Sequence, residues 1–382
     1  MVITRALKKQ IKEKLIHDKK IILLYGPRQV GKTTLIRDII SQTPFKTLSI
    51  NADETKYIDI LSSRDLRKLD GLTAGYELIF IDEAQRIPDI GINLKILHDA
   101  RPHLKIIATG SSSFELAQKA TEPLTGRTWT YTLYPIAYLE LRGDFNQFEL
   151  DEQLEERLIF GSYPQIFSYI NNEDKKKYLE ELSNAYLYKD ILELSSIKNS
   201  MKIRNLLQLL AYQIGNEVSL TEIGQKLMLS KNTVDTYIDL LQKSFVLIRL
   251  SGLSRNLRKE VTQKDKIFFT DLGIRNILIN NLKPLKERDD NGRLWENFLI
   301  IERLKKTIYT NASMNRYFWR TYTGAEIDYI EEYGGYLHGY EFKLGKKIAN
   351  PPLSWNEAYP NNTYTTVNKN NYLKFILQDD VP

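Results

Sequence analysis

The sequence predicts an α/β fold with a mostly parallel sheet, followed by a helical region and an α+β carboxyl-terminal part. Four short apolar runs recur early in the chain with helical patterns between them, at residues 21–25, 47–50, 78–81 and 105–108. Apolar runs separated by helices are typical of a parallel sheet that is covered on both faces. At 382 residues the chain is also long for one hydrophobic core, so we expect two or three domains.

The composition is that of an ordinary globular protein, with 42% hydrophobic and 27% charged residues. No apolar run approaches the roughly 18 residues that a membrane-spanning helix needs, and the first residues lack the apolar core of a signal peptide. The absence of cysteine excludes disulfides and thiolate metal sites, and four scattered histidines argue against a zinc site. We therefore expect a cytoplasmic protein without a membrane partner.

A glycine-rich segment joins the first apolar run to the helical pattern at residues 32–40. It reads Gly26-Pro-Arg-Gln-Val-Gly31-Lys32-Thr33 and matches the phosphate-binding pattern G-x-x-x-x-G-K-[ST] in a strand–loop–helix context. Glycines let the backbone wrap a triphosphate, and the start of the helix offers N–H groups to it. Lys32 would reach the β- and γ-phosphates, and the Thr33 hydroxyl would bind Mg²⁺. The predicted nucleotide-binding residues are Gly26, Pro27, Arg28, Gln29, Val30, Gly31, Lys32, Thr33 and Thr34.

The apolar run at residues 78–81 ends in two carboxylates, Asp82 and Glu83. Ligands of open α/β sheets bind at the carboxyl ends of the strands. Asp82 would hold Mg²⁺, directly or through water, and Glu83 would orient and deprotonate the attacking water. The pair follows a phosphate loop, which favours a hydrolysis site over a solvated turn.

The apolar run at residues 105–108 ends in the hydroxyl residues Thr109, Ser111, Ser112 and Ser113. Two interpretations of these residues are open. Thr109 or Ser111 would face the γ-phosphate or the attacking water, or the hydroxyls would only cap a helix that starts near Phe114, for which Ser112 and Ser113 are suited.

Together these motifs resemble one prokaryotic AAA-type ATPase family. The resemblance rests, in order, on residues 26–33, 81–85, 109–113, 124–127 and 134–140. In that family the ATPase core is joined to a carboxyl-terminal domain of unknown function.

The resemblance implies that strand 105–109 lies between the strands that precede the phosphate loop and Asp82. It also implies a sensor role for Thr109 and makes Arg127 a candidate for sensing the γ-phosphate, in cis or from a neighbouring subunit. Arg127 as a plain surface residue is the alternative. Arg28 is a second arginine candidate.

Residues 219–241 predict a helix–turn–helix. Ser219 begins one amphipathic helix, Met228-Leu-Ser230 turns the chain, and Ser230 caps a second helix. In the DNA-reading form of this motif the second helix enters the major groove through its first residues, here Lys231, Asn232, Thr233 and Thr236. Strands at 245–250 and 266–270 would flank a basic wing with Arg255, Arg258 and Lys259.

Positive charge is concentrated in this region. Between residues 243 and 266, seven Lys and Arg residues stand against two acidic residues, and clustered cations attract phosphates. However, Asp235 and Asp239 on the second helix would oppose DNA if exposed. Nucleic-acid binding and protein docking both remain open for this region, and RNA is not excluded as a partner.

The last part of the chain resembles a restriction-endonuclease-like nuclease. Three antiparallel strands are predicted between residues 317 and 343, with Asp328 on one and Glu341-Phe-Lys343 on the next. In such nucleases two carboxylates bind Mg²⁺ and the lysine activates water, and Glu296 would supply an extra helical acid. The alternatives are an edge hairpin with ordinary surface charges, or a fold that persists as a binding platform without cleavage.

These predictions combine into a chain with four regions. We expect an AAA-type P-loop ATPase core at 1–145, a helical region at 146–215, a winged helix-turn-helix at 216–280 and a nuclease-like α+β domain at 290–382. The predicted function is Mg²⁺-dependent ATP hydrolysis coupled to a module that acts on nucleic acid. The alternative is a nucleotide-operated switch whose carboxyl-terminal modules dock a protein partner or subunit, and a homo-oligomer is compatible with the sequence.

Overall fold

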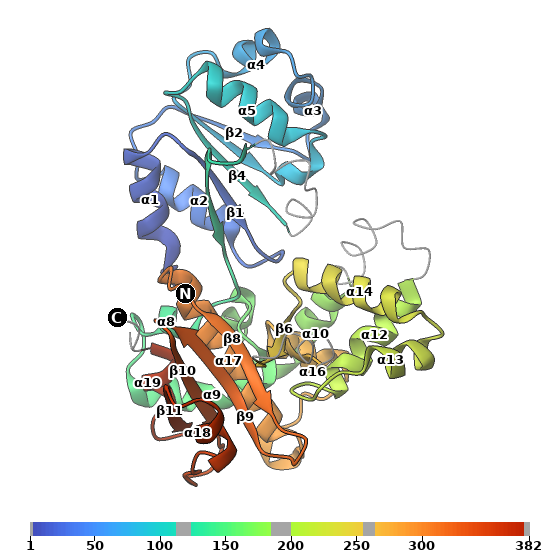
Figure 1. Ribbon diagram of the computed structural model, residues 1–382. Helices are drawn as coiled ribbons and strands as arrows, with labels where there is room; N and C mark the ends of the chain where they lie inside the picture. The colour runs from blue at the N-terminus through green and yellow to red at the C-terminus, as the bar shows by residue number, and fades with distance from the viewer. Residues whose placement is uncertain (1–2, 112–123, 185–199, 255–263, 378–382) are drawn as a thin grey trace.

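The protein has two lobes joined by the segment that follows strand β5 (Figure 1). The computed structural model describes residues 3–111, 124–184, 200–254 and 264–377. The upper lobe consists of α1 (Leu7–His17), β1 (Ile21–Tyr25), α2 (Lys32–Ile40), β2 (Thr47–Asn51), α3 (Thr55–Leu61), α4 (Leu66–Thr73), β3 (Leu78–Asp82), α5 (Ile90–Ala100), β4 (Lys105–Gly110) and β5 (Thr128–Thr132).

The upper lobe is built on a five-stranded sheet in the order β2-β3-β4-β1-β5, in which every pair is parallel. All five residues of β1 are buried, as expected for a strand covered on both faces. The structure therefore confirms the α/β fold with a parallel sheet, and it confirms that β4 lies between β1 and β3. The fifth strand, β5, was not predicted, although its Thr-Trp-Thr-Tyr-Thr sequence is rich in residues that favour strands.

The lower lobe combines helices with a six-stranded sheet. Its helices are α8 (Tyr138–Leu141), α9 (Gln147–Phe160), α10 (Asn172–Leu182), α12 (Ser200–Tyr212), α13 (Leu220–Leu227), α14 (Lys231–Lys243), α16 (Leu272–Leu278), α17 (Asn291–Tyr309), α18 (Leu353–Ala358) and α19 (Tyr372–Leu377). Its strands are β6 (Leu247–Gly252), β7 (Lys266–Phe269), β8 (Asn315–Arg320), β9 (Glu326–Tyr333), β10 (Tyr336–Phe342) and β11 (Asn362–Val367).

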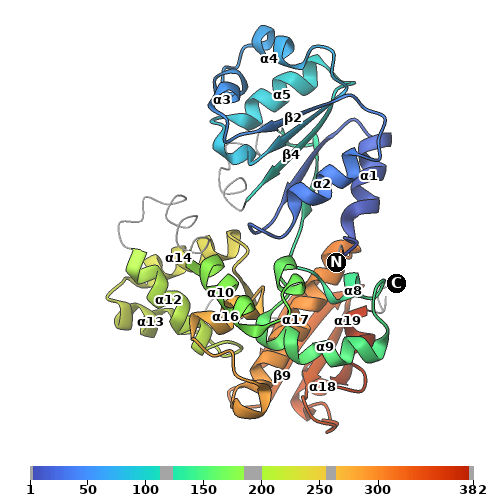
Figure 2. The same ribbon diagram turned by 180° about the vertical axis from the view of Figure 1, so that it is seen from behind.

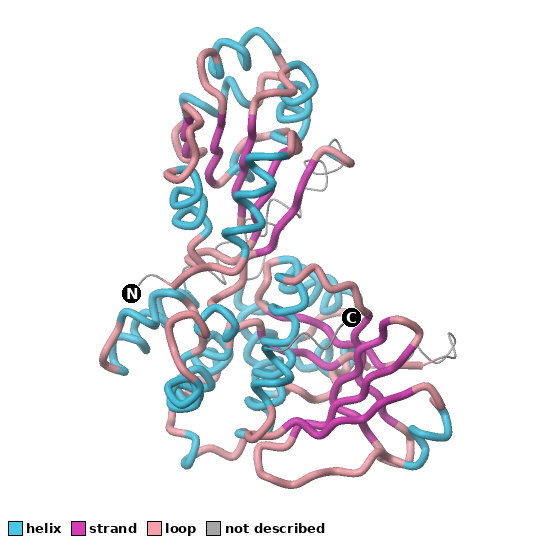
Figure 3. The backbone as a smooth tube through the Cα atoms, turned by 90° about the vertical axis from the view of Figure 1, so that its left-hand side faces the viewer, coloured by secondary structure: helices cyan, strands magenta, loops and turns pink. Residues whose placement is uncertain are grey.

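The strands of the lower lobe follow the order β11-β10-β9-β8-β6-β7. Seen from the side, most helices of the lobe lie on one side of these strands (Figure 3). The predicted antiparallel strands appear as β8, β9 and β10. Strand β11, which pairs in parallel with β10, was not predicted, because the turn residues around it dominated the local pattern.

The region predicted as a winged helix and the predicted tail share one sheet. Strand β6 pairs with β7 on one side and, at Ser251 and Gly252, with β8 on the other. Strands from both sides of the predicted separation at residues 280–290 therefore pair in one sheet. Figures 1 and 2 show α12, α13 and α14 grouped at one side of this lobe.

The helical region also packs directly onto the residues that follow it. The Asp271 carboxylate caps α16 by accepting from Ile274 N at 3.2 Å, and it accepts from Ser162 N at 2.7 Å. A side chain at Gly161 would place Cβ 2.1 Å from the same carboxylate. This close approach joins α9 to α16, so the predicted boundary at residue 215 is also internal to the lobe.

Within the described parts of the chain, no helix is both long enough and apolar enough to cross a membrane.

Candidate nucleotide-binding site

The phosphate loop lies between β1 and α2, at the carboxyl edge of the upper sheet. Its backbone takes positive φ angles at Gly26 (148°), Gln29 (59°) and Gly31 (93°), which glycine adopts without strain. Lys32 is 5% exposed, and its ammonium donates to the carbonyl oxygens of Gly26 and Pro27 at 2.8 Å each. The lysine is therefore folded back over the loop, in the position from which it can reach a bound phosphate.

Gly26 is required because the chain crosses itself here. Leu133, which follows β5, donates its N–H to the Tyr25 carbonyl at 2.8 Å. A Cβ at Gly26 would lie 2.1 Å from the Leu133 carbonyl oxygen, a contact with backbone that side-chain movement cannot relieve. The phosphate loop therefore rests directly on the segment that leads into the lower lobe.

Asp82 is the polar centre of the site. The Thr33 hydroxyl donates to Asp82 Oδ2 at 2.8 Å, and the Thr109 hydroxyl donates to Asp82 Oδ1. Strands β1, β3 and β4 are neighbours, so the loop helix, Asp82 and Thr109 meet at one edge. A hydroxyl and a carboxylate at this spacing are oxygen ligands of the kind that Mg²⁺ prefers beside phosphates.

Glu83 follows Asp82 in a left-handed conformation, with φ of 54°. Its carboxylate accepts a hydrogen bond from the Gln85 side-chain amide at 2.5 Å. Non-glycine residues in this strained conformation cluster at functional sites. The conformation of Glu83 therefore fits a carboxylate that its backbone turns toward a reacting group. Gln85 holds the carboxylate in place, which the sequence pattern alone did not indicate.

A buried residue that was not predicted as functional, Arg5, contacts the phosphate loop and pairs with the buried Glu140. Arg5 donates to the carbonyl oxygens of Val30 and Tyr134 at 2.6 Å each and to Glu140 Oε1 at 3.1 Å. Val30 belongs to the phosphate loop, whereas Tyr134 and Glu140 belong to the segment that enters the lower lobe. Glu140 fell within a motif noted above, but a single arginine ahead of α1 carries no signal that sequence reasoning could use.

The structure does not bring Arg127 to the phosphate loop. The Arg127 carbonyl accepts from Ile21 N at 2.9 Å, at the amino end of β1, whereas the loop follows the carboxyl end. Five residues of strand separate the two ends, roughly 16 Å at about 3.3 Å per residue. The guanidinium instead pairs with Asp99 on α5 at 2.8 and 3.1 Å. A γ-phosphate sensor role for Arg127 in cis is therefore wrong for this arrangement.

Of the other hydroxyl candidates, Ser111 is buried at 1% exposure, whereas Ser112 and Ser113 lie outside the described residues. Arg28 lies half-buried within the loop.

The predicted helix–turn–helix appears as α13 and α14. Ser219 and Ser230 accept from Glu222 N at 3.3 Å and from Thr233 N at 3.1 Å, as N-caps of the two helices. Met228 turns the chain in a left-handed conformation. The side chains of Lys231, Asn232 and Thr236 are exposed at the start of α14, and Thr233 is half-buried.

The positive charge near this motif is less available than the sequence suggested. Arg249 pairs with Asp235 at 2.7 Å and Lys243 with Asp239 at 2.9 Å. Lys266 is buried against Glu296, so it cannot contact a phosphate backbone. Arg255, Arg258 and Lys259 of the predicted wing lie outside the described residues.

The four predicted nuclease residues come together in the lower lobe. The Glu341 carboxylate pairs with Lys343 at 2.5 Å, and Asp328 Oδ2 accepts from Phe342 N at 2.8 Å. Burial raises the pKa of the Asp328 and Glu341 carboxyls; the negative charge of Glu326 adds to the effect at Asp328, and that of Asp328 adds to the effect at Glu341. Glu296 from α17 belongs to the same cluster, and burial raises its pKa to about 8.

Comparison with known proteins supports the assignment of the upper lobe. A model described as an AAA domain matches residues 18–142, and two domains of unknown function, DUF8612 and DUF4143, match residues 151–285 and 291–366. An uncharacterised protein of Mycobacterium tuberculosis, Rv2008c, is 30% identical over 346 residues, which cover 89% of this chain and 73% of that protein. This chain belongs to the same family as that protein, and its upper lobe is an AAA domain with the fold of a P-loop ATPase.

More distant relatives share the same architecture. An uncharacterised protein of Methanocaldococcus jannaschii, MJ1544, is 25% identical over 346 residues, covering 85% of this chain and 75% of that protein. The Walker-type ATPase PABY2304 of Pyrococcus abyssi matches with a TM-score of 0.50 at 17% identity, over 72% of this chain and 96% of that one. This likeness shows a common fold, and together with the AAA domain it supports ATP binding by the upper lobe.

The crossing at Gly26 gives a first prediction. Gly26→Ala should weaken ATP binding by more than about tenfold and lower the melting temperature. The added methyl group would force the phosphate loop away from the linker, the segment from Leu133 to Glu140 that enters the lower lobe. Gly71→Ala is the matched control, since a Cβ there meets nothing within 4 Å and alanine favours the helix. Equal ATP affinities in calorimetry for Gly26→Ala and the parent protein would contradict the account.

Proposed function

We propose that this protein hydrolyses ATP with Mg²⁺ and uses the nucleotide state to control its lower lobe, which acts on nucleic acid. The observation that carries the proposal is the meeting of Thr33, Asp82 and Thr109 at the carboxyl edge of the sheet, beside the phosphate loop that buries Lys32. Thr33 and Asp82 are the residues that would hold Mg²⁺, directly or through water. The ion would neutralise charge that develops on the phosphates.

The residues around this centre have distinct roles in the proposal. Lys32 binds the β- and γ-phosphates, and the backbone N–H groups of the loop bind the remaining oxygens. Glu83 takes the proton from the attacking water while Gln85 orients its carboxylate. Thr109 keeps Asp82 in position and senses the γ-phosphate from β4.

Coupling to the lower lobe would run through the segment beneath the loop. Helix α17 holds this segment at three points: Tyr309 Oη accepts from Tyr134 N at 3.0 Å, Glu302 accepts from Tyr138 N at 2.6 Å, and Lys305 donates to the Ile136 carbonyl at 3.3 Å. Arg5 ties the same segment to Val30. A shift of the loop on nucleotide binding would therefore act on α17 through packed hydrogen bonds.

The hydrolysis mechanism predicts different outcomes for two variants. Lys32→Ala should abolish ATP binding, whereas Glu83→Gln should retain it and slow turnover by about 100-fold or more, since a general base contributes about 10²–10⁴-fold. Glu13→Gln, a change to an exposed glutamate of α1, is the matched control. Binding is followed by calorimetry and turnover by phosphate release. Undiminished turnover in Glu83→Gln would contradict the assignment of Glu83 as the general base.

Nucleic-acid binding is the finer part of the proposal. The start of α14, with the exposed Lys231 and Asn232 and the half-buried Thr233, would contact phosphates and bases together with the predicted wing residues, as a winged helix does. The paired state of Asp235 and Asp239 supports the proposal, because cations offset the carboxylates that would oppose DNA.

Salt dependence provides the test of this binding. Lys231→Ala in the full chain should weaken binding to duplex DNA and lower the slope of log K against log salt by about 1, because one phosphate contact is lost. Lys177→Ala on α10, another exposed lysine, should leave the slope unchanged. The measurement is fluorescence anisotropy from low to moderate salt, and equal slopes for Lys231→Ala and the parent would remove α14 from the interface.

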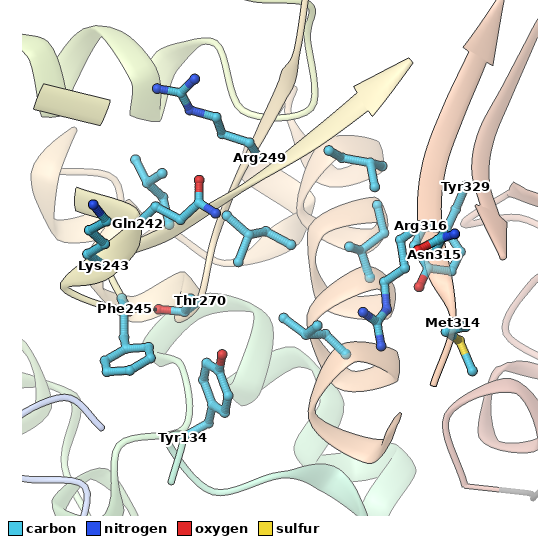
Figure 4. Close-up of a pocket in the computed structure, with 15 residues that line it drawn as sticks. Tyr134, Gln242, Lys243, Phe245, Arg249, Thr270, Met314, Asn315, Arg316 and Tyr329 are labelled. Carbon is cyan, nitrogen blue, oxygen red and sulfur yellow. Dashed lines mark hydrogen bonds between the residues drawn. The ribbon is translucent and has the colours of Figure 1, made fainter. Parts of the chain in front are cut away.

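A second candidate function, docking of a protein partner, is favoured by a pocket of about 740 Å³ in the lower lobe. Strands β6 and β8 pair only at Ser251–Tyr317 and Gly252–Phe318, and the pocket opens where they diverge. Figure 4 shows Arg249 on the β6 side and Arg316 on the β8 side, with α17 between them. An extended peptide fits an opening of this shape. The absence of DNA binding by the full chain at low salt would favour this function.

A further inference from the structure

A lysine from outside the predicted nuclease motif enters the acidic cluster of the lower lobe. Lys266 begins β7, and its ammonium lies 3.3 Å from Glu296 Oε1 of α17. The residue is only 5% exposed, so its charge cannot be solvated by bulk water. It faces the charges of Asp328 and Glu326 as well as Glu296.

The cluster contains buried acids from three elements. Glu296 comes from α17, Asp328 from β9 and Glu341 from β10, and the last two are each 8% exposed. Buried carboxylates are costly unless a cation pairs with them. Lys266 supplies that cation for Glu296, and Lys343 supplies it for Glu341 at 2.5 Å. Two of the three acids are therefore paired with lysines of this chain, and the third, Asp328, accepts a hydrogen bond from the backbone N–H of Phe342 at 2.8 Å.

A divalent cation does not fit this arrangement. Mg²⁺ and Mn²⁺ need several oxygen ligands around one point. Across the part of the chain that the structure describes, no three acidic or histidine side chains are placed to hold a metal ion, and the two carboxylates of the predicted Mg²⁺ pair, Asp328 and Glu341, each accept a hydrogen bond from within the chain. The backbone N–H of Phe342 already binds Asp328, and the ammonium of Lys266 stands beside Glu296, where it would repel an incoming ion.

We propose that Lys266 occupies the cation position of this cluster, so that the nuclease-like part of the chain binds no divalent metal and performs no metal-dependent cleavage. The cluster instead joins two parts of the lower lobe. Lys266 belongs to the region matched by one domain of unknown function, and Glu296, Asp328 and Glu341 to the next. The buried ion pair holds β7 and the β6–β7 ribbon against α17.

The test measures Mn²⁺ binding to the full chain by electron paramagnetic resonance of free Mn²⁺, in an Asp82→Asn background that removes the carboxylate proposed to hold Mg²⁺ at the nucleotide site. The parent should show no site tighter than about 1 mM, the weak end of protein carboxylate sites. Lys266→Met should gain a Mn²⁺ site, which Glu341→Gln added to it should remove. Lys266→Arg is the control, because it keeps the charge and should bind no Mn²⁺.

Three results would overturn the proposal. The first is a Mn²⁺ site in the parent that Glu341→Gln removes, and the second is nicking of plasmid DNA by the parent that depends on Glu341. The third is a folded Lys266→Met protein, judged by circular dichroism, that binds no Mn²⁺. Should Lys266→Met fail to fold, Lys266→Gln makes the same comparison with a polar side chain. The Asp82→Asn background keeps these results independent of the ATPase.

Discussion

The contact between the phosphate loop and the linker beneath it is the constraint on which the arrangement of both lobes depends. Leu133 crosses under Gly26 so closely that no side chain fits. Arg5 then fixes the crossing with three hydrogen bonds, one to the loop and two to the linker. Glu140, fully buried, accepts from Arg5 and from the backbone of Ala6 and Ala137. A buried ion pair satisfied in this way specifies one geometry, and losing either partner would leave an uncompensated charge.

This constraint keeps the linker in direct contact with the phosphate loop. The same linker is held by α17 from the other side, through Tyr309, Glu302 and Lys305. Helix α17 also carries Glu296, which pairs with Lys266 of β7. A continuous chain of hydrogen bonds and ion pairs therefore runs from the phosphate loop to the sheet of the lower lobe. The proposed coupling from ATP to the lower lobe and the cluster of Lys266 with its three acids therefore depend on the same set of contacts.

Much of the upper lobe could be predicted, because its signals are local. Buried strands are short continuous apolar runs, and the glycine-rich pattern is recognised as a phosphate loop because a strand precedes it and a helix follows it. The sequence also placed Asp82 and Thr109 at the same edge of the sheet. It could not locate Arg127, because a residue before a strand carries no information on which end of the sheet it reaches. Strand β5 was not predicted because its residues, which are only partly buried, do not form a continuous apolar run.

Most helices and strands of the lower lobe could be predicted from the sequence, but the way in which they pack together could not. The caps Ser219 and Ser230 and the antiparallel strands followed from local patterns. The merging of the β6–β7 ribbon with β8 depends on contacts between residues far apart in sequence. For the same reason Lys266 was counted as a surface cation. Only the fold shows that a lysine more than 60 residues before Asp328 lies among the acids of the predicted nuclease motif.

The most direct test of the account is hydrogen exchange of α17 in the Glu83→Gln protein, measured by mass spectrometry with and without ATP. The account predicts that ATP changes exchange in residues 291–309, and that adding Arg5→Lys abolishes this change while ATP still binds. Arg64→Lys, at an exposed arginine, should leave the change intact. If ATP binds without altering exchange in α17, or if the change persists with Arg5→Lys, the proposed coupling is contradicted.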